Sequence, residues 1–253
     1  MRWQRGSVLM PPIDFIPLAE ETGLIIPMSE WAIHEAARQA RIWQDSFGFS
    51  DSIAVNLPNR LFERTDLVEC IQDAVTTYGV PCRAIELEIT ETSLMKDLQT
   101  VIPTLHRLND IGVAISIDDF GTGYSSLAYL TTLPISELKI DRSFVRDLGL
   151  TPQSTAVVTA IIALARSLGL RVVAEGVENL RQMEVLHRLG CGLMQGFLFS
   201  RPQPPEAIET WLRQTVLPRK APWIGRAEDA GIADAPRVYA EVLGGATRAN
   251  PLG

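Results

Sequence analysis

Short apolar runs rich in β-branched residues alternate with longer amphipathic stretches along most of this chain, and this order constrains the fold more than any other feature. A repeated strand-then-helix order predicts a parallel sheet covered by helices. Repeat units of roughly 20 to 35 residues are typical of a TIM-type barrel. The sequence therefore predicts one α/β domain with six parallel strands. The predicted strands are residues 53–57, 85–90, 114–119, 137–141, 172–177 and 193–199, and the predicted helices are 28–46, 60–78, 97–111, 154–168, 179–189 and 204–216.

Composition narrows the class of protein further. The 253 residues are 46% hydrophobic, which is enough to bury a sizeable core. The net charge of −7 argues against binding to a nucleic-acid polymer or an anionic membrane, because both favour a positive surface. No apolar stretch is long enough to span a bilayer, and the first residues do not resemble a signal peptide. Three cysteines without CxxC spacing indicate neither a zinc site nor a disulfide framework, so we expect a cytoplasmic protein.

The amino-acid composition of the chain changes near Pro218. From there to Gly253 the chain is rich in Ala, Gly, Arg and Pro and has little apolar periodicity. Such a composition cannot bury enough apolar surface to order itself. We therefore expect a folded domain over residues 1–217 and a poorly ordered tail over residues 218–253.

Polar residues stand at or near the carboxyl end of every predicted strand. In a barrel of parallel strands these ends gather on one face, where active sites are found. Inward-facing ionisable groups cost stability unless they are paired or bind a metal. We therefore interpret the set as one functional site. Its members are Asn56, Glu88, Glu91, Asp118, Asp119, Lys139, Asp141, Glu175, Glu178 and Gln195.

The adjacent carboxylates Asp118 and Asp119, followed by a glycine-rich turn, indicate a divalent-metal site. Two neighbouring carboxylates near low dielectric need a compensating cation, and Mg²⁺, Mn²⁺ or Ca²⁺ prefers oxygen ligands. A solvated acidic turn is the alternative interpretation. Two metals bridged by a carboxylate can activate water and stabilise a leaving oxygen in phosphodiester cleavage. Asp118 is placed to bridge the two metal ions. Asn56 and Glu88 complete the ligands of one ion, and Asp119 favours the other.

The remaining strand-end residues allow more than one role. Lys139 suits a group that orients water or stabilises phosphoryl oxygens, and it also suits a salt-bridge partner within the acidic set. Glu175 suits a general base or a ligand of the second metal. Glu91 lies just past its strand, so it is better placed to anchor the loop that begins at Gly121. Gln195 suits either a ligand contact or a structural amide hydrogen bond.

Several runs in this chain closely resemble the EAL domain of cyclic di-GMP phosphodiesterases. The resemblance extends from the first residue to about Pro204, and its motifs are highly specific in combination. It implies a TIM-like (β/α)8 barrel, opening of cyclic di-GMP to linear pGpG with Mg²⁺ or Mn²⁺, and a frequent homodimer. The matching runs are residues 15–20, 86–91, 118–127, 138–144, 174–178 and 195–196.

The resemblance also implies a role for each matching residue. It assigns Lys139 and Glu175 to water handling and Glu91 to anchoring the loop after the aspartate pair. Arg2 matches an arginine that meets a substrate phosphate. The implied metal ligands are Asn56, Glu88, Asp118 and Asp119, and the implied substrate-side or supporting residues are Asp141, Glu178 and Gln195.

The chain departs from the family pattern at its start. The Glu-Ala-Leu signature normally comes directly before a hydrophobic residue, Arg and Trp, and here the first three residues are Met1-Arg2-Trp3. We therefore expect a barrel of the EAL type that lacks its first two strands, with the signature glutamate upstream and Met1 an internal methionine. A real truncation is the alternative. Without that glutamate the chain could also be an impaired cyclic di-GMP-binding module or a poorly folding fragment.

Overall fold

A six-stranded parallel sheet forms the centre of the protein. The computed structural model describes residues 1–96, 98–123 and 127–216. Each strand pairs with the next along the chain, in the order β3-β4-β5-β6-β7-β8. This topology confirms the predicted α/β class and the six parallel strands. The strands are β3 (Ile53–Asn56), β4 (Ile85–Thr90), β5 (Ala114–Phe120), β6 (Glu137–Ile140), β7 (Arg171–Ala174) and β8 (Leu193–Met194).

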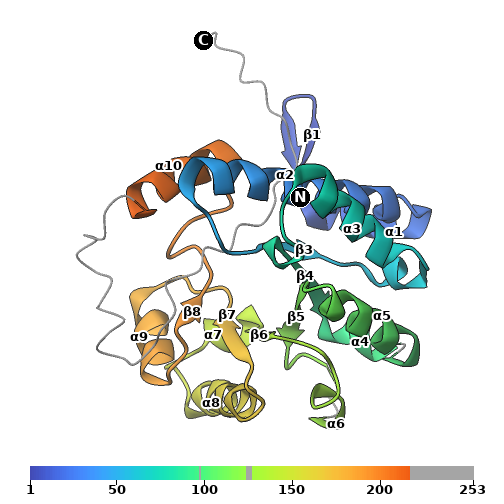
Figure 1. Cartoon of the computed structure of the whole chain (residues 1–253). Helices are drawn as coiled ribbons and strands as arrows, with labels where there is room; N and C mark the ends of the chain where they lie inside the picture. The colour runs from blue at the N-terminus through green and yellow to red at the C-terminus, as the bar shows by residue number, and fades with distance from the viewer. Residues whose placement is uncertain (97, 124–126, 217–253) are drawn as a thin grey trace.

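The sheet curls into a half-barrel with the major helices around its outside, as Figure 1 shows. Strands β3 and β8 are its two edges, and no pairing joins them among the described residues. The carboxyl ends of the six parallel strands lie at one end of this half-barrel, which we call the mouth. The outer helices are α2 (Ile25–Phe47), α3 (Leu67–Tyr78), α5 (Leu98–Asp110), α8 (Pro152–Ser167), α9 (Leu180–Arg188) and α10 (Pro205–Val216).

Strand β4 illustrates why these residues form buried strands. Side chains alternate between the two faces of a strand. The odd-numbered residues Ile85, Leu87 and Ile89 are apolar and have no exposed surface. The even-numbered Glu86 and Glu88 belong to the other face and are also buried, at 1% and 3% exposure. The strand is thus covered on both sides, as parallel sheets usually are, and one side carries charge into the interior.

The last two strands are shorter than predicted. We expected residues 172–177 and 193–199 to be extended, but β7 ends at Ala174 and β8 at Met194. The reason lies in the glycines that follow. Gly176 has a φ of 66° and Gly196 a φ of 157°, which turn the backbone away from the strand direction. The turn at Gly196 packs so closely on the backbone of Val177 that a Cβ would overlap it.

Several elements lay outside the predicted set. An antiparallel hairpin of β1 (Trp3–Arg5) and β2 (Val8–Met10) precedes α1 (Pro12–Thr22) and stands apart from the main sheet (Figure 1). Strands of three residues are too short to give a period, and a proline inside α1 hides the helical pattern. The other short elements are η2 (Cys82–Ala84), α4 (Glu91–Lys96), α6 (Leu127–Leu130) and α7 (Arg142–Arg146). The helix predicted over residues 60–78 is divided into η1 (Asn59–Glu63) and α3.

Two further predictions concern the ends of the chain and the membrane. The predicted tail over residues 218–253 lies outside the described residues. None of the helices in the described part of the chain combines the length and the apolar character that a membrane span requires.

Candidate active site

The two adjacent aspartates stand at a β-bulge at the carboxyl end of β5. Between two positions that pair with β6, β5 has one residue more than its partner, and Asp119 takes a left-handed backbone conformation with a φ of 54°. Neighbouring residues of a regular strand point to opposite faces. The bulge removes that constraint, so carboxylate oxygens of both Asp118 and Asp119 lie near Glu175. The bulge therefore explains how adjacent aspartates can serve one site.

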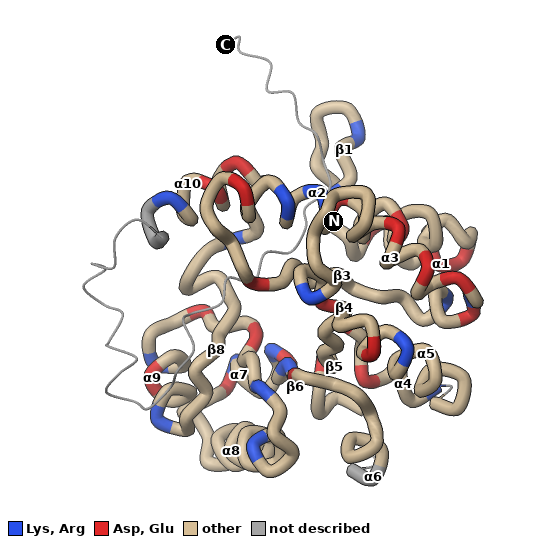
Figure 2. The backbone as a smooth tube through the Cα atoms, in the orientation of Figure 1, with Lys and Arg blue, Asp and Glu red and all other residues tan. Residues whose placement is uncertain are grey.

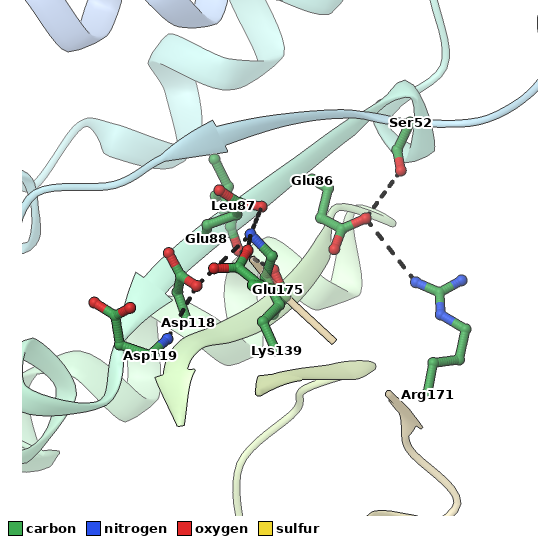
Figure 3. A network of polar contacts seen from close by, with 10 residues as sticks. Ser52, Glu86, Leu87, Glu88, Asp118, Asp119, Lys139, Arg171 and Glu175 are labelled. Carbon is green, nitrogen blue, oxygen red and sulfur yellow. Dashed lines mark hydrogen bonds and ion pairs between the residues drawn. The ribbon is translucent and has the colours of Figure 1, made fainter. Parts of the chain in front are cut away.

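Lys139 lies at the centre of these carboxylates, on the buried strand β6. Its Nζ is 2.5 Å from an oxygen of Glu175, 2.6 Å from an oxygen of Glu88 and 3.6 Å from an oxygen of Asp118. Figure 3 shows the three side chains converging on it, and Figure 2 shows acidic and basic positions gathered around β6. Only 3% of the Lys139 side chain is exposed. We call Glu88, Asp118, Asp119, Lys139 and Glu175 the acidic cluster.

The protonation of the cluster follows from burial and mutual charge. Burial raises the pKa of Glu88 to about 7 and the pKa of Glu175 to about 7, although the charge of Lys139 opposes both shifts. Burial alone would lower the pKa of Lys139, but Glu88, Glu175 and Asp118 outweigh it and raise that pKa well above its ordinary value. Lys139 is therefore a permanent cation, whereas the two glutamates exchange protons near neutral pH.

Asp119 and Asp141 form a second titrating pair. Burial, helped by the charge of Asp118 and the hydrogen bond to Asp141, raises the pKa of Asp119 to about 6. Burial also acts on Asp141, but the hydrogen bonds from Ser143 and Asp119 outweigh it and lower its pKa. The backbone N–H of Ser143 donates to Asp141 at 2.9 Å, which makes Asp141 the N-cap of α7. When the pair carries one proton, that proton is therefore held on Asp119 rather than on Asp141.

The donor set fits a hard divalent cation. Asp118, Asp119 and Glu175 each offer a carboxylate oxygen, and these atoms all lie within 4.8 Å of one another. Oxygen ligands at this spacing are what Mg²⁺, Mn²⁺ and Ca²⁺ prefer. Side-chain exposures of 13% for Asp118 and 18% for Glu175 leave room for access from the mouth. The set includes Glu175, whereas the sequence placed Glu88 among the ligands and left Glu175 open between base and ligand.

Glu91 contacts the loop after the aspartate pair, as the sequence predicted. It is the first residue of α4 and is 1% exposed. Its Oε2 accepts the backbone N–H of Gly121 at 2.7 Å and that of Gly123 at 3.3 Å. A Cβ at Gly123 would lie 3.1 Å from the carboxylate, so glycine permits this close approach. The contact is present, while its consequence for metal binding stays a prediction.

Two other predicted residues lie at the same end of the sheet. Asn56 ends β3 and stands beside Glu88 in the register of the two strands. Gln195 directly follows β8, where its backbone N–H donates to Ala174 at 2.8 Å and its carbonyl accepts from Val177 at 3.0 Å. These backbone bonds hold Gln195 beside the end of β7. The structure therefore places both residues at the mouth, and their roles stay predictions.

Arg2 and Glu178 make no such contact with the acidic cluster. Arg2 lies just before β1 and donates to the Met1 carbonyl at 2.9 Å. Glu178 is exposed in the turn before α9, where its backbone N–H donates to Gln182 at 2.7 Å. Within the described ranges, no hydrogen bond or ion pair joins either side chain to the cluster. Their predicted contacts with substrate remain predictions.

Sequence reasoning missed three charged residues that lie nearer the amino ends of the same strands than the acidic cluster does. Glu86 and Glu137 precede Glu88 and Lys139 by two residues on the same strands, and Arg171 begins β7. The strand-end rule points only to the carboxyl ends of the strands. The period of two would have revealed these residues, because positions two apart share a face of a strand.

A comparison with protein families identifies the family of this chain. The family model described as EAL domain matches residues 1–202. The chain belongs to the EAL domain family. The match covers every residue of the acidic cluster and also Glu91, Asp141 and Gln195.

Curated relatives of this EAL domain are signalling proteins. The signaling protein YkoW of Bacillus subtilis is 48% identical over 204 residues, which are 81% of this chain and 25% of that protein. The bifunctional diguanylate cyclase/cyclic di-GMP phosphodiesterase MucR of Pseudomonas aeruginosa is 46% identical over 209 residues, or 82% of this chain and 30% of MucR. The chain thus spans between a quarter and a third of the length of these relatives.

Solved EAL structures share the fold. A structure described as PaMucR phosphodiesterase in a c-di-GMP complex matches with a TM-score of 0.78 and 47% identity, over 82% of this chain and 84% of that one. The EAL enzyme Bd1971, in its form with cAMP and cyclic-di-GMP bound, matches with a TM-score of 0.80 and 37% identity, over 83% of this chain and 58% of that one. The predicted EAL resemblance and the TIM-like α/β fold are confirmed.

Proposed function

We propose that this EAL domain hydrolyses cyclic di-GMP to linear pGpG, with Mg²⁺ or Mn²⁺ as cofactor. The observation that carries the proposal is the set of carboxylate oxygens from Asp118, Asp119 and Glu175 within 4.8 Å of one another beside the buried Lys139. The names of its relatives support the same substrate, since MucR is a cyclic di-GMP phosphodiesterase by name and was solved with c-di-GMP.

The acidic cluster supplies the ligands for the metal. Asp118 and Asp119 are the best placed, because the bulge brings both carboxylates to one site. Glu88 and Asn56, which are paired in register, complete the predicted ligand set for a two-metal site. Bound cations of this kind activate a water molecule and stabilise the leaving oxygen of a phosphodiester.

Lys139 and Glu175 are the proposed water-handling pair. The Glu175 carboxylate, with a pKa of about 7, can accept a proton near neutral pH, which is what a general base needs. Lys139 is 2.5 Å from it and stays charged, so it holds Glu175 in place and can stabilise negative charge that develops on phosphoryl oxygens. The alternative role for Lys139, a salt-bridge partner of the cluster, is compatible with these contacts.

Four residues around the mouth are proposed to meet the substrate. Gln195 lies beside the end of β7, and Asp141 caps α7 next to Asp119. Glu178 and Arg2 are assigned by their match to the family motifs. Glu91 is proposed as the loop anchor, because its carboxylate accepts two backbone N–H groups from the loop after Asp119.

The proposed domain extends to residue 217. Helix α10 lies beyond the family match, yet Leu212 is 2% exposed and the Arg213 guanidinium lies 4.8 Å from the ring centre of Phe47 on α2. These contacts support counting α10 with the domain. A homodimer and a cytoplasmic location belong to the same proposal, and both rest on the family resemblance and the composition.

The proposal is tested by incubating the purified chain with cyclic di-GMP and Mn²⁺ or Mg²⁺ and following linear pGpG by chromatography. We expect product with either metal and none after treatment with EDTA. Binding of cyclic di-GMP without product would contradict hydrolysis and favour a binding module. Product that persists in EDTA would contradict the metal requirement.

A further inference from the structure

A second group of polar side chains lies inside the curled sheet, at the end opposite to the acidic cluster. Glu86 is the second residue of β4, Glu137 the first of β6 and Arg171 the first of β7, while Ser52 directly precedes β3. Glu86 and Glu137 are 1% and 0% exposed. The proposed mechanism uses none of these residues. We call the four the amino-end network.

Arg171 joins the two buried carboxylates. Its Nε lies 3.1 Å from Glu137 Oε2, and its Nη2 lies 3.9 Å from Glu86 Oε2. The hydroxyl of Ser52 donates to the same Glu86 oxygen at 2.9 Å, as Figure 3 shows. A guanidinium presents its donors in a rigid fork, so one arginine can hold two carboxylates in a defined arrangement. The network thus links β3, β4, β6 and β7.

The network lies directly beneath the acidic cluster on the same strands. Glu86 shares a face of β4 with Glu88, and Glu137 shares a face of β6 with Lys139, because side chains two residues apart point the same way. The contact of 2.6 Å between Glu88 and Lys139 also joins β4 to β6. Two links therefore cross the interior between the same two strands, one above the other.

Both links depend on how tightly the sheet is curled. Strand β5 separates β4 from β6, so their backbones lie about 10 Å apart at the usual spacing of about 4.8 Å per strand. In a closed barrel, strand number and stagger set the curvature. Here β3 and β8 are edges, and no pairing joins them in the described ranges. Contacts across the interior and the outer helices therefore contribute to the curvature, together with the twist of the strands.

We propose that Arg171 is a positioning residue that holds β4 and β6 at the separation required for the contact between Glu88 and Lys139. It touches neither the proposed substrate nor the proposed metal ligands, so it acts through Glu86 and Glu137. The inference rests on the proposed function only where metal binding and turnover are measured. The arrangement of the two strands can be measured without either.

The test compares R171M with R188M, a matched control that removes an exposed arginine from the end of α9. Hydrogen exchange of the metal-free proteins is measured for residues 85–90 and 137–140, and Mn²⁺ affinity is measured by electron paramagnetic resonance. We expect R171M to exchange faster in both strands and to bind Mn²⁺ about tenfold more weakly, with R188M unchanged. Unaltered hydrogen exchange in R171M would overturn the proposal. This result does not depend on whether the chain hydrolyses cyclic di-GMP.

A third variant separates positioning from simple charge compensation. E86Q/E137Q/R171M removes the guanidinium and both carboxylates, so no unpaired charge is left in the interior. We expect its melting temperature to recover relative to R171M, while exchange in the two strands stays fast and kcat falls below that of the unaltered chain at an unchanged KM. Full recovery of exchange and kcat would show that charge balance alone mattered and would overturn the proposal.

Ser52→Ala provides the test if R171M fails to fold. It removes the hydrogen bond to Glu86 and changes no charge. We expect faster exchange in residues 85–90 and a small loss of Mn²⁺ affinity, both in the direction expected for R171M. Exchange equal to that of the unaltered chain would overturn the proposal.

Discussion

The acidic cluster and the amino-end network place a similar motif at two depths of the same sheet. In each, a basic side chain bridges carboxylates that come from β4 and from strands beyond β5. The two differ in exposure and in the basic group. In the cluster, the side chains of Asp118 and Glu175 are 13% and 18% exposed and face the compact ammonium of Lys139. Those of the network are at most 1% exposed and face the guanidinium of Arg171.

This difference teaches which of the two places can admit an ion. Lysine carries a point charge, and a metal cation can substitute for it when carboxylates outnumber it. Arg171 is ion-paired with both carboxylates of the network, and these are at most 1% exposed although the Arg171 side chain itself is 28% exposed. The cluster is therefore suited to exchange cations, whereas the network is suited to hold its strands in place.

Replacing Lys139 with methionine should have the largest effect on stability and should separate the cluster from the network most clearly. Removal of one partner of a buried ion pair costs about 3 kcal/mol or more, because the remaining charges are uncompensated. We expect K139M to lose that much stability in urea unfolding without metal and to regain part of it with Mn²⁺. R171M should also lose stability, but Mn²⁺ should not reduce its deficit relative to the unaltered chain measured in the same Mn²⁺. Equal recovery in both variants would contradict the distinction.

Asp118→Asn should abolish turnover through loss of a metal ligand. Mutation of a residue that only supports a metal ligand lowers metal affinity or activity about 10 to 100-fold. Loss of a direct ligand should therefore lower turnover more than about 100-fold. The pGpG assay measures this effect. Asp110→Asn, at the exposed end of α5, is the matched control and should remain fully active. Normal turnover in D118N would refute the assignment of Asp118.

Metal affinity should rise with pH. Glu88 and Glu175 have pKa values of about 7 and Asp119 one of about 6, so below these values protons compete with the cation. Each carboxylate that must lose its proton weakens binding by about tenfold per pH unit below its pKa. Calorimetric titration with Mn²⁺ at pH 6, 7 and 8 measures the slope. An affinity that is constant over this range would contradict the assignment.

The same shifts give the opposite trend for the metal-free fold. A carboxyl whose pKa is raised on folding stabilises the folded state below its ordinary value of 4.5, and that contribution is lost as the pH rises to about 7. Thermal unfolding in EDTA should therefore show a lower melting temperature at pH 8 than at pH 5.5. A higher melting temperature at pH 8 would contradict the raised pKa values.

Ser52→Ala should have the smallest effect on stability. It removes one hydrogen bond to a charged group, which contributes about 1.5 kcal/mol or somewhat more. Urea unfolding measures the loss. Because no charge changes and Mn²⁺ affinity falls only slightly, Mn²⁺ should not reduce the difference in stability between S52A and the unaltered chain. Mn²⁺-dependent recovery would mean that the network and the cluster are not distinct.

Much of the fold could be predicted from the periodic spacing of apolar residues in the sequence. The strand at residues 85–90 was predicted with its correct bounds, because alternation and β-branched residues are strong over six positions. The strand-end rule for parallel sheets also placed Asp118, Lys139 and Glu175 together. Their contacts in the structure agree with that rule.

The rest depended on geometry that no period encodes. The bulge that turns both aspartates toward one site arises from the register in which β5 pairs with β6, which the residues of β5 alone do not determine. The same holds for Arg171, since its two partners come from other strands. Sequence reasoning places a residue on a face of a strand, but the curvature of the sheet decides which residues meet across it.

The left-handed backbone at Asp119 has a consequence for how such a site changes during evolution. Among residues with a side chain, asparagine and aspartate tolerate this conformation best, and glycine adopts it freely. Each aspartate codon is a single nucleotide away from an asparagine codon and from a glycine codon. One point mutation can therefore remove the carboxylate and leave the bulge intact, so a descendant of this chain could lose a proposed metal ligand while its sheet continues to fold.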